Sequence, residues 1–302
     1  MKISYSAFDT FNRCPLQYKL SYIEHIRVPE KPELYFGGLI HEIVQFALKK
    51  DPIIPPVTEL TTMLKNRWRE EIFPSKDSAK QYFDFGVDML KKFHSGFQPG
   101  LRNIVAVEKR FQIPLNEKHI LSGVIDRIDK LPFGAFEVID YKTSKSLPTQ
   151  SEVDRDKQLG LYNLAVENLW PEAKDIRLTL YYLKHDSQIT TKRRPDEVED
   201  VKTEVIDTAE TIEKEQEFTP RLNPLCDWCD YQNRCPLQKY KFQDKQKEID
   251  AEIEEYILAH KKISELEPKI HQHFDDAKIE RYFHKNGVVS RSKTGKISIR
   301  KK

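Results

Sequence analysis

The sequence predicts a fold of the α/β or α+β class, built around one main domain. Residues 102–131 and 135–143 resemble three β-strands, and residues 176–194 resemble a strand pair that turns near residue 186. Helix-like segments precede, separate and follow these strands. A chain of 302 residues is long enough for one large domain or two small ones. Interspersed helices and strands of this kind favour helices packed against a central sheet.

Helical patterns dominate the first hundred residues. Ser6 and Asp9 fit a capping box, which predicts the start of a helix that carries Cys14. The pair Gly37-Gly38 precedes "LIHEIVQFALKK", a second helix pattern in which His41 lies one residue away from the apolar stripe. Two amphipathic segments follow the proline-rich residues 51–56, near 58–73 and 77–95.

Residues 123–145, "GVIDRIDKLPFGAFEVIDYKTSK", predict a β-hairpin with its turn at 131–134. Because side chains alternate along a strand, Asp126 shares a face with Val124 and Ile128, together with Ile120. Asp140 and Lys142 share a face with Phe136 and Val138. The charged side chains therefore lie on apolar faces.

A hairpin that is symmetric about Phe133 places Asp126 directly opposite Asp140. Two buried carboxylates that close together must share a proton or a cation. Oxygen ligands suit a hard divalent metal such as Mg²⁺ or Mn²⁺. The alternative is an exposed pair of acids on an edge hairpin.

The second half of the chain is mainly helical. Ser151 and Asp154 fit a capping box that opens a helix running to residue 169, and another helix is expected near 198–217. Residues 240–280 are charged and helical, with an apolar stripe that we expect to pack: Ile249, Ile253, Tyr256 and Ile257. The last 20 residues suggest a small hairpin around Asn286-Gly287. Beyond Glu280 the tail has eight Lys or Arg and no acid, which favours either phosphate contacts or a solvated end.

Composition excludes an integral membrane protein. The chain is 38% hydrophobic and 32% charged, with a net charge of +2. No apolar run approaches the roughly 20 residues that span a bilayer. The start, "MKISYSAFDTF", lacks an apolar core of signal-peptide length, so a cytoplasmic protein is expected.

The four cysteines indicate a metal centre. Cys226, Cys229 and Cys235 form a C-x2-C-x5-C cluster, and Cys14 lies far upstream. Clustered cysteines in a cytoplasmic chain more often bind metal than form disulfides.

Asp126, Asp140 and Lys142 together suit the hydrolysis of a phosphodiester. Two residues apart on one strand, Asp140 and Lys142 point into the same cavity. A metal held by two carboxylates activates water and neutralises a phosphate, and a nearby lysine positions that water or stabilises the charge that develops.

The ordered segments "GGLIHEIV", "VEKRF", "SGVIDRID", "VIDYKTS" and "QLGLY" resemble the RecB-type branch of the PD-(D/E)XK nucleases, over roughly residues 1–240. The cysteine arrangement is similar to that of the AddB nuclease and the CRISPR-associated RecB-like exonucleases. The resemblance implies a restriction-endonuclease-like central mixed sheet flanked by helices, stapled by a [4Fe–4S] cluster. Residues 241–302 are then a helical extension with a basic C-terminal hairpin.

The resemblance also assigns roles to individual residues. It implies metal ligation by His41, Asp126, Asp140 and the backbone carbonyl of Tyr141, with Lys142 as the catalytic lysine. Gln158 and Tyr162 match a Q-x-x-x-Y pair that lies near the substrate. Glu108 matches a strand glutamate whose role is less defined, and the four cysteines, Cys14, Cys226, Cys229 and Cys235, match the cluster ligands.

Two alternatives stay open at this point. Structural zinc also takes four thiolates, usually as two C-x2-C pairs, and the isolated Cys14 favours the iron–sulfur cluster over zinc. The function is either a metal-dependent DNA exonuclease, acting on single strands or DNA ends, or a cluster-bearing DNA-binding subunit with a silent nuclease site. In both cases DNA is the expected partner, with a helicase or recombination protein as a further one.

Overall fold

The computed structural model describes residues 1–97, 103–292 and 294–301. The chain divides into two compact units, residues 1–230 and 231–302, and each is treated by itself. The boundary expected at residue 240 lies later in the chain, and the assignment of nuclease chemistry to the first part stays a prediction. No described helix is both long and apolar enough to cross a bilayer.

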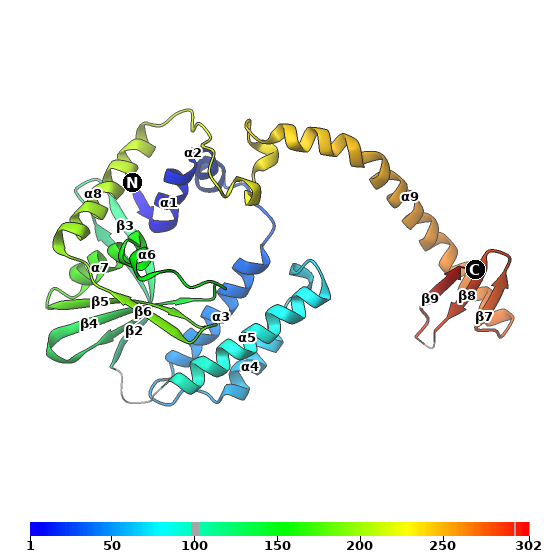
Figure 1. Ribbon diagram of the computed structural model, residues 1–302, viewed down its shortest axis with the longest axis horizontal. Coiled ribbons are helices and arrows are strands. Elements are labelled where there is room, and N and C mark those ends of the chain that lie inside the picture. Colours follow the sequence, from blue (N-terminus) through cyan, green and yellow to red (C-terminus); the bar gives the residue numbers. More distant parts are fainter. Residues whose placement is uncertain (98–102, 293, 302) are drawn as a thin grey trace. The chain divides into compact units, whose positions relative to one another are not determined.

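The first unit holds most of the regular structure (Figure 1). Its strands are β1 (Lys2–Ser4), β2 (Ile104–Pro114), β3 (Ile120–Lys130), β4 (Ala135–Lys142), β5 (Asp175–Tyr182) and β6 (Ser187–Thr191). Its helices are α1 (Tyr5–Arg13), α2 (Pro15–Tyr18), α3 (Pro32–Leu48), α4 (Val57–Asn66), α5 (Lys76–Gly96), α6 (Gln150–Asp154), α7 (Lys157–Leu169) and α8 (Pro195–Lys214). The predicted three strands and the predicted strand pair are confirmed.

The six strands form one mixed sheet in which β3 is the common neighbour. β2 pairs antiparallel with β3 along one edge. On the other edge β1 pairs in parallel with residues 120–122, and β4 pairs antiparallel with residues 127–130. β5 runs parallel to β4, and β6 runs antiparallel to β5. Residues 123–126 of β3 therefore lie between two partner strands, and the sheet opens there.

Helices cover both faces of the sheet. On one face α1, α7 and α8 contribute buried Phe8, Leu159 and Val205 to the core that holds Phe136 and Val138 of β4. On the other face α3, α4 and α5 form a second core, which holds Ile139 and Tyr141. Alternate side chains of β4 thus enter different cores, as strand geometry requires. The α/β class, with a central mixed sheet flanked by helices, is confirmed.

Three helix starts differ from the prediction. α1 begins at Tyr5, because Ser4 Oγ accepts a hydrogen bond from Ala7 N over 3.2 Å, and Cys14 lies between α1 and α2. α3 begins at Pro32 and contains Gly37-Gly38 rather than following them, since proline is well placed at a first helical position. Thr149 and Glu152 form the capping box, and Asp156 caps a separate helix α7, so the predicted single helix is two.

The hairpin register matches the prediction. Residues 127–130 pair with 139–136 in the symmetric register about Phe133, which adopts a left-handed φ of 61° in the turn. One predicted apolar position is wrong: Ile120 is 42% exposed, because it lies at the start of β3 beside the short edge strand β1.

The second unit consists of α9 (Lys239–Asp276) and a small sheet of β7 (Arg281–His284), β8 (Gly287–Arg291) and β9 (Ile297–Lys301). The predicted two-stranded hairpin is therefore three-stranded, and Lys293 and Lys302 of the tail lie outside the described residues. Phe274 of α9 is 1% exposed. The predicted packing of the α9 stripe is not confirmed within this unit, where the four side chains are exposed: Ile249, Ile253, Tyr256 and Ile257.

Candidate active site

The opening in the sheet positions Asp126. The β3–β4 ladder ends at Arg127 and Ile139, one pair before Asp126 and Asp140. Tyr141 N donates instead to Asp126 Oδ2 over 2.9 Å. A backbone donor of β4 is thereby satisfied by a carboxylate rather than by a strand, as buried N–H groups require. The carboxylate stands in the gap between the two strands, where groups from both faces of the sheet can reach it.

Asp140 and Lys142 lie side by side on β4. Asp140 is 4% exposed, and its Oδ2 atom lies 2.6 Å from Lys142 Nζ without hydrogen-bond geometry. Burial raises the pKa of Asp140, and Asp126 raises it further, against the opposing charge of Lys142. Burial opposes the charge on Lys142, but its pKa is raised because the Asp140 carboxylate outweighs that effect. The predicted orientation into one cavity is what brings these charges together.

His41 reaches Asp126 from α3, on the other face of the sheet. Its Nδ1 atom lies 3.3 Å from Asp126 Oδ2. Burial disfavours the imidazolium, but the contact with Asp126 and the charge of Asp140 raise the pKa of His41. One turn earlier on α3, a Cβ at Gly37 would lie 3.3 Å from Thr143 Oγ1. A glycine at this position lets α3 come close to the end of β4.

Gln158 and Tyr162 of α7 contact the catalytic candidates from the opposite side. Lys142 Nζ donates to Gln158 Oε1 over 3.2 Å, and Gln158 Nε2 donates to Tyr162 Oη over 2.8 Å. The Tyr162 hydroxyl lies 2.9 Å from Val124 O and 3.4 Å from Asp140 Oδ1. This pair therefore orients Lys142 and Asp140, and a contact with substrate stays a prediction.

Glu108 lies on β2 at the same level as Asp126. The neighbouring pairs Val107–Arg127 and Lys109–Ile125 put Glu108 opposite Asp126 in the antiparallel register. Its φ of 51° is left-handed, an uncommon conformation for a glutamate inside a strand. Such backbone outliers concentrate at functional sites. The Glu108 carboxylate is also 3.8 Å from Lys49 Nζ, so an ordinary ion pair accounts for part of its surroundings.

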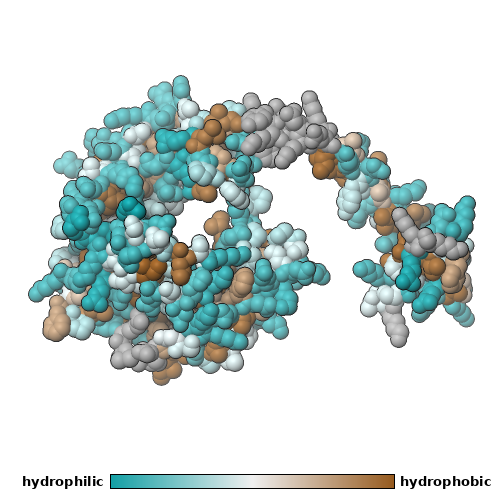
Figure 2. All heavy atoms as spheres, in the orientation of Figure 1, coloured by the Kyte–Doolittle hydropathy of each residue, from teal (hydrophilic) through white to brown (hydrophobic). Residues whose placement is uncertain are grey.

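A cavity of about 590 Å³ joins these residues. Figure 2 shows the first unit hollowed near the start of α3. Its walls include Glu33, Gly38, His41, Glu108, Asp126 and Thr143. A volume of this size is typical of a ligand site.

The donor set suits a hard divalent cation in type. Asp126 and Asp140 offer carboxylate oxygens, His41 offers a ring nitrogen, and the buried Asp140 Oδ2 makes no hydrogen bond. Among the described residues, however, no three histidine, cysteine or acidic side chains are grouped closely enough to hold a metal ion. A cation at this site would need Lys142 to release Asp140.

The predicted cysteine staple is not shown. All four cysteines are free and partly exposed, and Cys235 belongs to the second unit. In the first unit, Asn223 links the loop before Cys226 to the end of α1: its Nδ2 lies 3.4 Å from Arg13 O, next to Cys14. Asn223 N also lies 3.3 Å from Cys226 Sγ. The structure thus brings the neighbourhoods of Cys14 and Cys226 together, without a cluster of ligands.

Sequence reasoning missed a buried ion pair behind the site. Arg127 Nη2 lies 2.6 Å from Asp129 Oδ2, and the two side chains are 3% and 1% exposed. Arg127 Nη1 also donates to Tyr141 Oη over 3.3 Å. The pair fixes the ring of Tyr141, whose N–H holds Asp126. Both residues alternate with the apolar positions of β3, so the sequence pattern placed them on a polar face.

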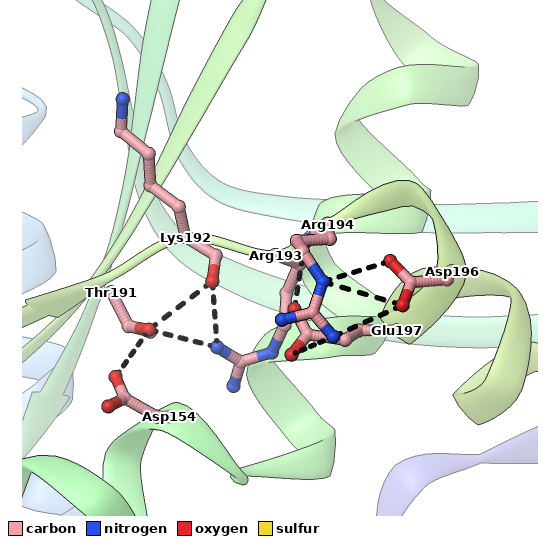
Figure 3. A network of polar contacts seen from close by, with 7 residues as sticks. All are labelled: Asp154, Thr191, Lys192, Arg193, Arg194, Asp196 and Glu197. Carbon is pink, nitrogen blue, oxygen red and sulfur yellow. Dashed lines mark hydrogen bonds and ion pairs between the residues drawn. The ribbon is translucent and has the colours of Figure 1, made fainter.

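Arg193 is a second residue that the sequence did not reveal. Its Nη2 donates to Val153 O and to Asp156 O, both over 2.9 Å, at the junction of α6 and α7. Its Nη1 donates to Thr191 Oγ1 over 3.0 Å (Figure 3). Arg193 therefore ties β6 to the start of the helix that carries Gln158. In the sequence it stands in the basic run "TKRR", which favours a solvated segment.

Comparison with known proteins gives a family match. The family model described as the PD-(D/E)XK nuclease superfamily matches residues 2–236. One of the two subunits named for an ATP-dependent helicase/deoxyribonuclease in Streptococcus uberis is 25% identical over 154 residues, which are 49% of this chain and 14% of that protein. Its counterpart from Streptococcus agalactiae serotype Ia, which has the same name, is 25% identical over 152 residues, or 48% and 14%. The chain therefore spans only a small part of the length of these relatives.

A crystal structure of a candidate exonuclease from Eubacterium rectale is also similar. The match covers 76% of this chain and 87% of that one, at 14% identity and a TM-score of 0.46.

Proposed function

The chain belongs to the PD-(D/E)XK nuclease superfamily, and we propose that it is a divalent-metal-dependent deoxyribonuclease. In this proposal it is an exonuclease that acts on single-stranded DNA or on DNA ends in recombination, repair or replication. The observation that carries the proposal is the convergence of Asp126, Asp140 and Lys142 at the opening between β3 and β4. Like the relatives named above, the chain would be a nuclease in a DNA-processing pathway.

The metal would be Mg²⁺ or Mn²⁺, held by Asp126, Asp140, His41 and the carbonyl of Tyr141. When bound, it would supply charge neutralisation for the phosphate and an acidified water. Within the chain, Gln158 would hold the ammonium of Lys142 at the reacting phosphate, and the buried Arg127–Asp129 pair would keep Tyr141 and hence Asp126 in place. Glu108 would add a third carboxylate to the cavity wall.

A [4Fe–4S] cluster held by Cys14, Cys226, Cys229 and Cys235 is the finer part of the proposal. What supports it is the set of four free cysteines and the hydrogen bond of Asn223 between the loop of Cys226 and the residue before Cys14. The cluster would have a structural task, joining the start of the nuclease domain to its end.

A second candidate function is a DNA-binding subunit with a weak or silent nuclease site. The observation that favours it is the name of the relatives, each of which is a subunit of a helicase/deoxyribonuclease. A helicase subunit would then be the partner of this chain.

One digestion experiment separates the two functions. Purified protein is incubated with 5′- or 3′-labelled linear single strands and with circular single strands, with and without Mn²⁺, beside the Lys142→Ala variant. An exonuclease degrades the linear strands only with metal, spares the circles and loses activity in Lys142→Ala. Binding of DNA without metal-dependent degradation would support the silent subunit instead.

A further inference from the structure

Two lysines from separate loops converge on one aromatic ring beside the cavity. Lys145 follows β4, and Lys184 lies in the turn between β5 and β6. Lys184 Nζ lies 4.8 Å from the centre of the Phe85 ring of α5, and Lys145 Nζ lies 5.8 Å from it. Lys145 Nζ is also 5.0 Å from the Tyr82 ring. Each distance is within the range of a cation–π interaction.

The backbones that carry these lysines are fixed. The ring nitrogen Nε2 of His185 lies 2.9 Å from Lys145 O, and Lys92 Nζ donates to Lys184 O over 2.7 Å. Leu183 N donates to Lys142 O over 3.0 Å, which joins the same turn to the end of β4. The two ammonium groups therefore converge because of the fold rather than because of two independent flexible side chains.

Like charges that converge need a counter-charge. Within residues 1–97, 103–292 and 294–301, neither Lys145 nor Lys184 has a carboxylate at ion-pair distance, although most neighbouring lysines do. Lys145 is exposed, and Lys184 and the two rings are half-buried. Two accessible ammonium groups with a shared aromatic support and no acidic partner form a site for an anion.

This site lies at the rim of the catalytic cavity. Tyr82 Oη donates to Glu33 Oε1 over 2.8 Å, and Glu33 lines the cavity together with Thr143. Only three residues separate Lys145 from Lys142, so their Cα atoms are at most about 11 Å apart. An anion bound by Lys145 is therefore a few nucleotides at most from a phosphate that Lys142 contacts.

We propose that Lys145, Lys184 and the Phe85–Tyr82 rings bind phosphates of a single strand next to the one being cleaved. This inference rests on the proposed nuclease function. A single strand suits the site better than a duplex, because its backbone can follow a narrow rim and its bases can contact aromatic edges. The α5 side of the cavity is then the side on which the substrate strand lies.

The test measures binding without cleavage. A fluorescent single-stranded oligonucleotide is titrated with metal-free protein in EDTA at 50 to 200 mM salt, for the wild type and for Lys145→Gln/Lys184→Gln. Each lost phosphate contact lowers the log–log salt slope by about 0.7 for single strands. We expect the slope to fall by about 1.4, so that the wild type loses about sevenfold more affinity than the variant over this range.

Lys50→Gln/Lys130→Gln is the matched control. Lys50 lies 5.9 Å from the Phe46 ring and Lys130 lies 5.6 Å from the Phe136 ring, and neither lines the cavity. This control removes the same charge and the same kind of contact, and its slope should stay within about 0.3 of the wild type. Lys145→Arg/Lys184→Arg, which keeps both charges, should also keep the slope.

The outcomes separate this inference from the proposed function. A wild type that degrades DNA with Mn²⁺, beside a Gln variant with an unchanged slope and melting temperature, overturns the subsite alone. A flattened slope in the Gln variant of a protein that never cleaves DNA keeps the subsite and overturns the nuclease. Equal flattening in the control variant means a general charge effect and overturns the subsite.

Discussion

Tyr141 N donates a hydrogen bond to Asp126 Oδ2 over 2.9 Å, at the place where β3 and β4 stop pairing. The same oxygen lies 3.3 Å from His41 Nδ1. One carboxylate thus joins the backbone of β4 to a helix on the far face of the sheet. Asp126 therefore serves the fold and the cavity at once, and a substitution must separate the two tasks.

Asp126→Asn makes that separation. The amide oxygen can still accept from Tyr141 N, so the strands should keep their arrangement, but the negative charge is lost. We expect cleavage to fall by about a hundredfold or more, with a melting temperature close to the wild type. Calorimetric titration with Mn²⁺ should show weaker binding. Asp84→Asn, which changes an exposed ion pair with Lys80, is the control and should keep both properties.

Lys142→Met should make stability fall as pH rises. In the folded protein burial raises the pKa of Asp140, and Lys142 opposes this effect. Without the ammonium the folded pKa of Asp140 rises further above its unfolded value, so the folded variant holds a proton that the unfolded chain releases. Stability is then lost as pH increases from the wild-type pKa of Asp140 towards that of the variant, by at most about 1.4 kcal/mol per pH unit.

Urea unfolding of metal-free protein between pH 5 and 8 measures this effect. The difference in unfolding free energy between wild type and Lys142→Met should widen with pH. A difference that stays constant across this range would show that Asp140 keeps its ordinary charge state without Lys142.

Arg193→Met tests the anchor of α7. It removes two donors from Val153 O and Asp156 O, and each such loss costs about 1 kcal/mol. We expect a loss of roughly 2 kcal/mol in stability and a larger fall in kcat than rise in KM, because Gln158 no longer holds Lys142 firmly. Arg194→Met is the neighbouring control, since Arg194 makes only exposed pairs with Asp196 and Glu197 (Figure 3). Equal effects of the two substitutions would contradict the anchor.

The sequence predicted the parts of the site that lie close together in the chain. The hairpin register follows from the turn at residues 131–134, and a period of two then puts Asp126, Asp140 and Lys142 on the faces where the structure has them. Gln158 and Tyr162 share a helix face for the same local reason. Local periodicity is sufficient wherever one turn or one helix fixes the geometry.

The opening in the sheet could not be predicted in this way. It exists because β1 pairs with residues 120–122, more than a hundred residues along the chain, and so limits where β4 can pair. The Arg193 contacts and the close approach of Gly37 to Thr143 are likewise contacts between distant segments. In the tail, Ile297 and Ile299 alternate with polar residues as a strand does, but their basic neighbours gave the appearance of a solvated end.

The basic tail should contribute to DNA binding through its exposed charges. Lys285, Lys296 and Arg300 are exposed, whereas Arg291 pairs with Asp275 over 2.7 Å. Replacing the three exposed residues by Gln should flatten the salt slope for single strands by about two units. Lys261→Gln/Lys262→Gln/Lys269→Gln, on the exposed surface of α9, removes equal charge from the same unit and should change the slope less. Equal slopes for the two triple variants would leave the tail without a specific role.

The cysteines provide the last prediction. If they hold a [4Fe–4S] cluster, protein purified without oxygen should be brown and should contain about four irons per chain. The cluster would close a loop of some 200 residues, which restricts the unfolded chain by roughly 5 kcal/mol. Cys14→Ser and Cys229→Ser should therefore lose iron and lower the melting temperature by similar amounts, since each opens the same link. Asn223→Ala should cause a smaller loss, because it removes the contact beside Cys14 but keeps all four thiolates. Colourless protein with one zinc per chain would make the cluster assignment wrong and keep the link.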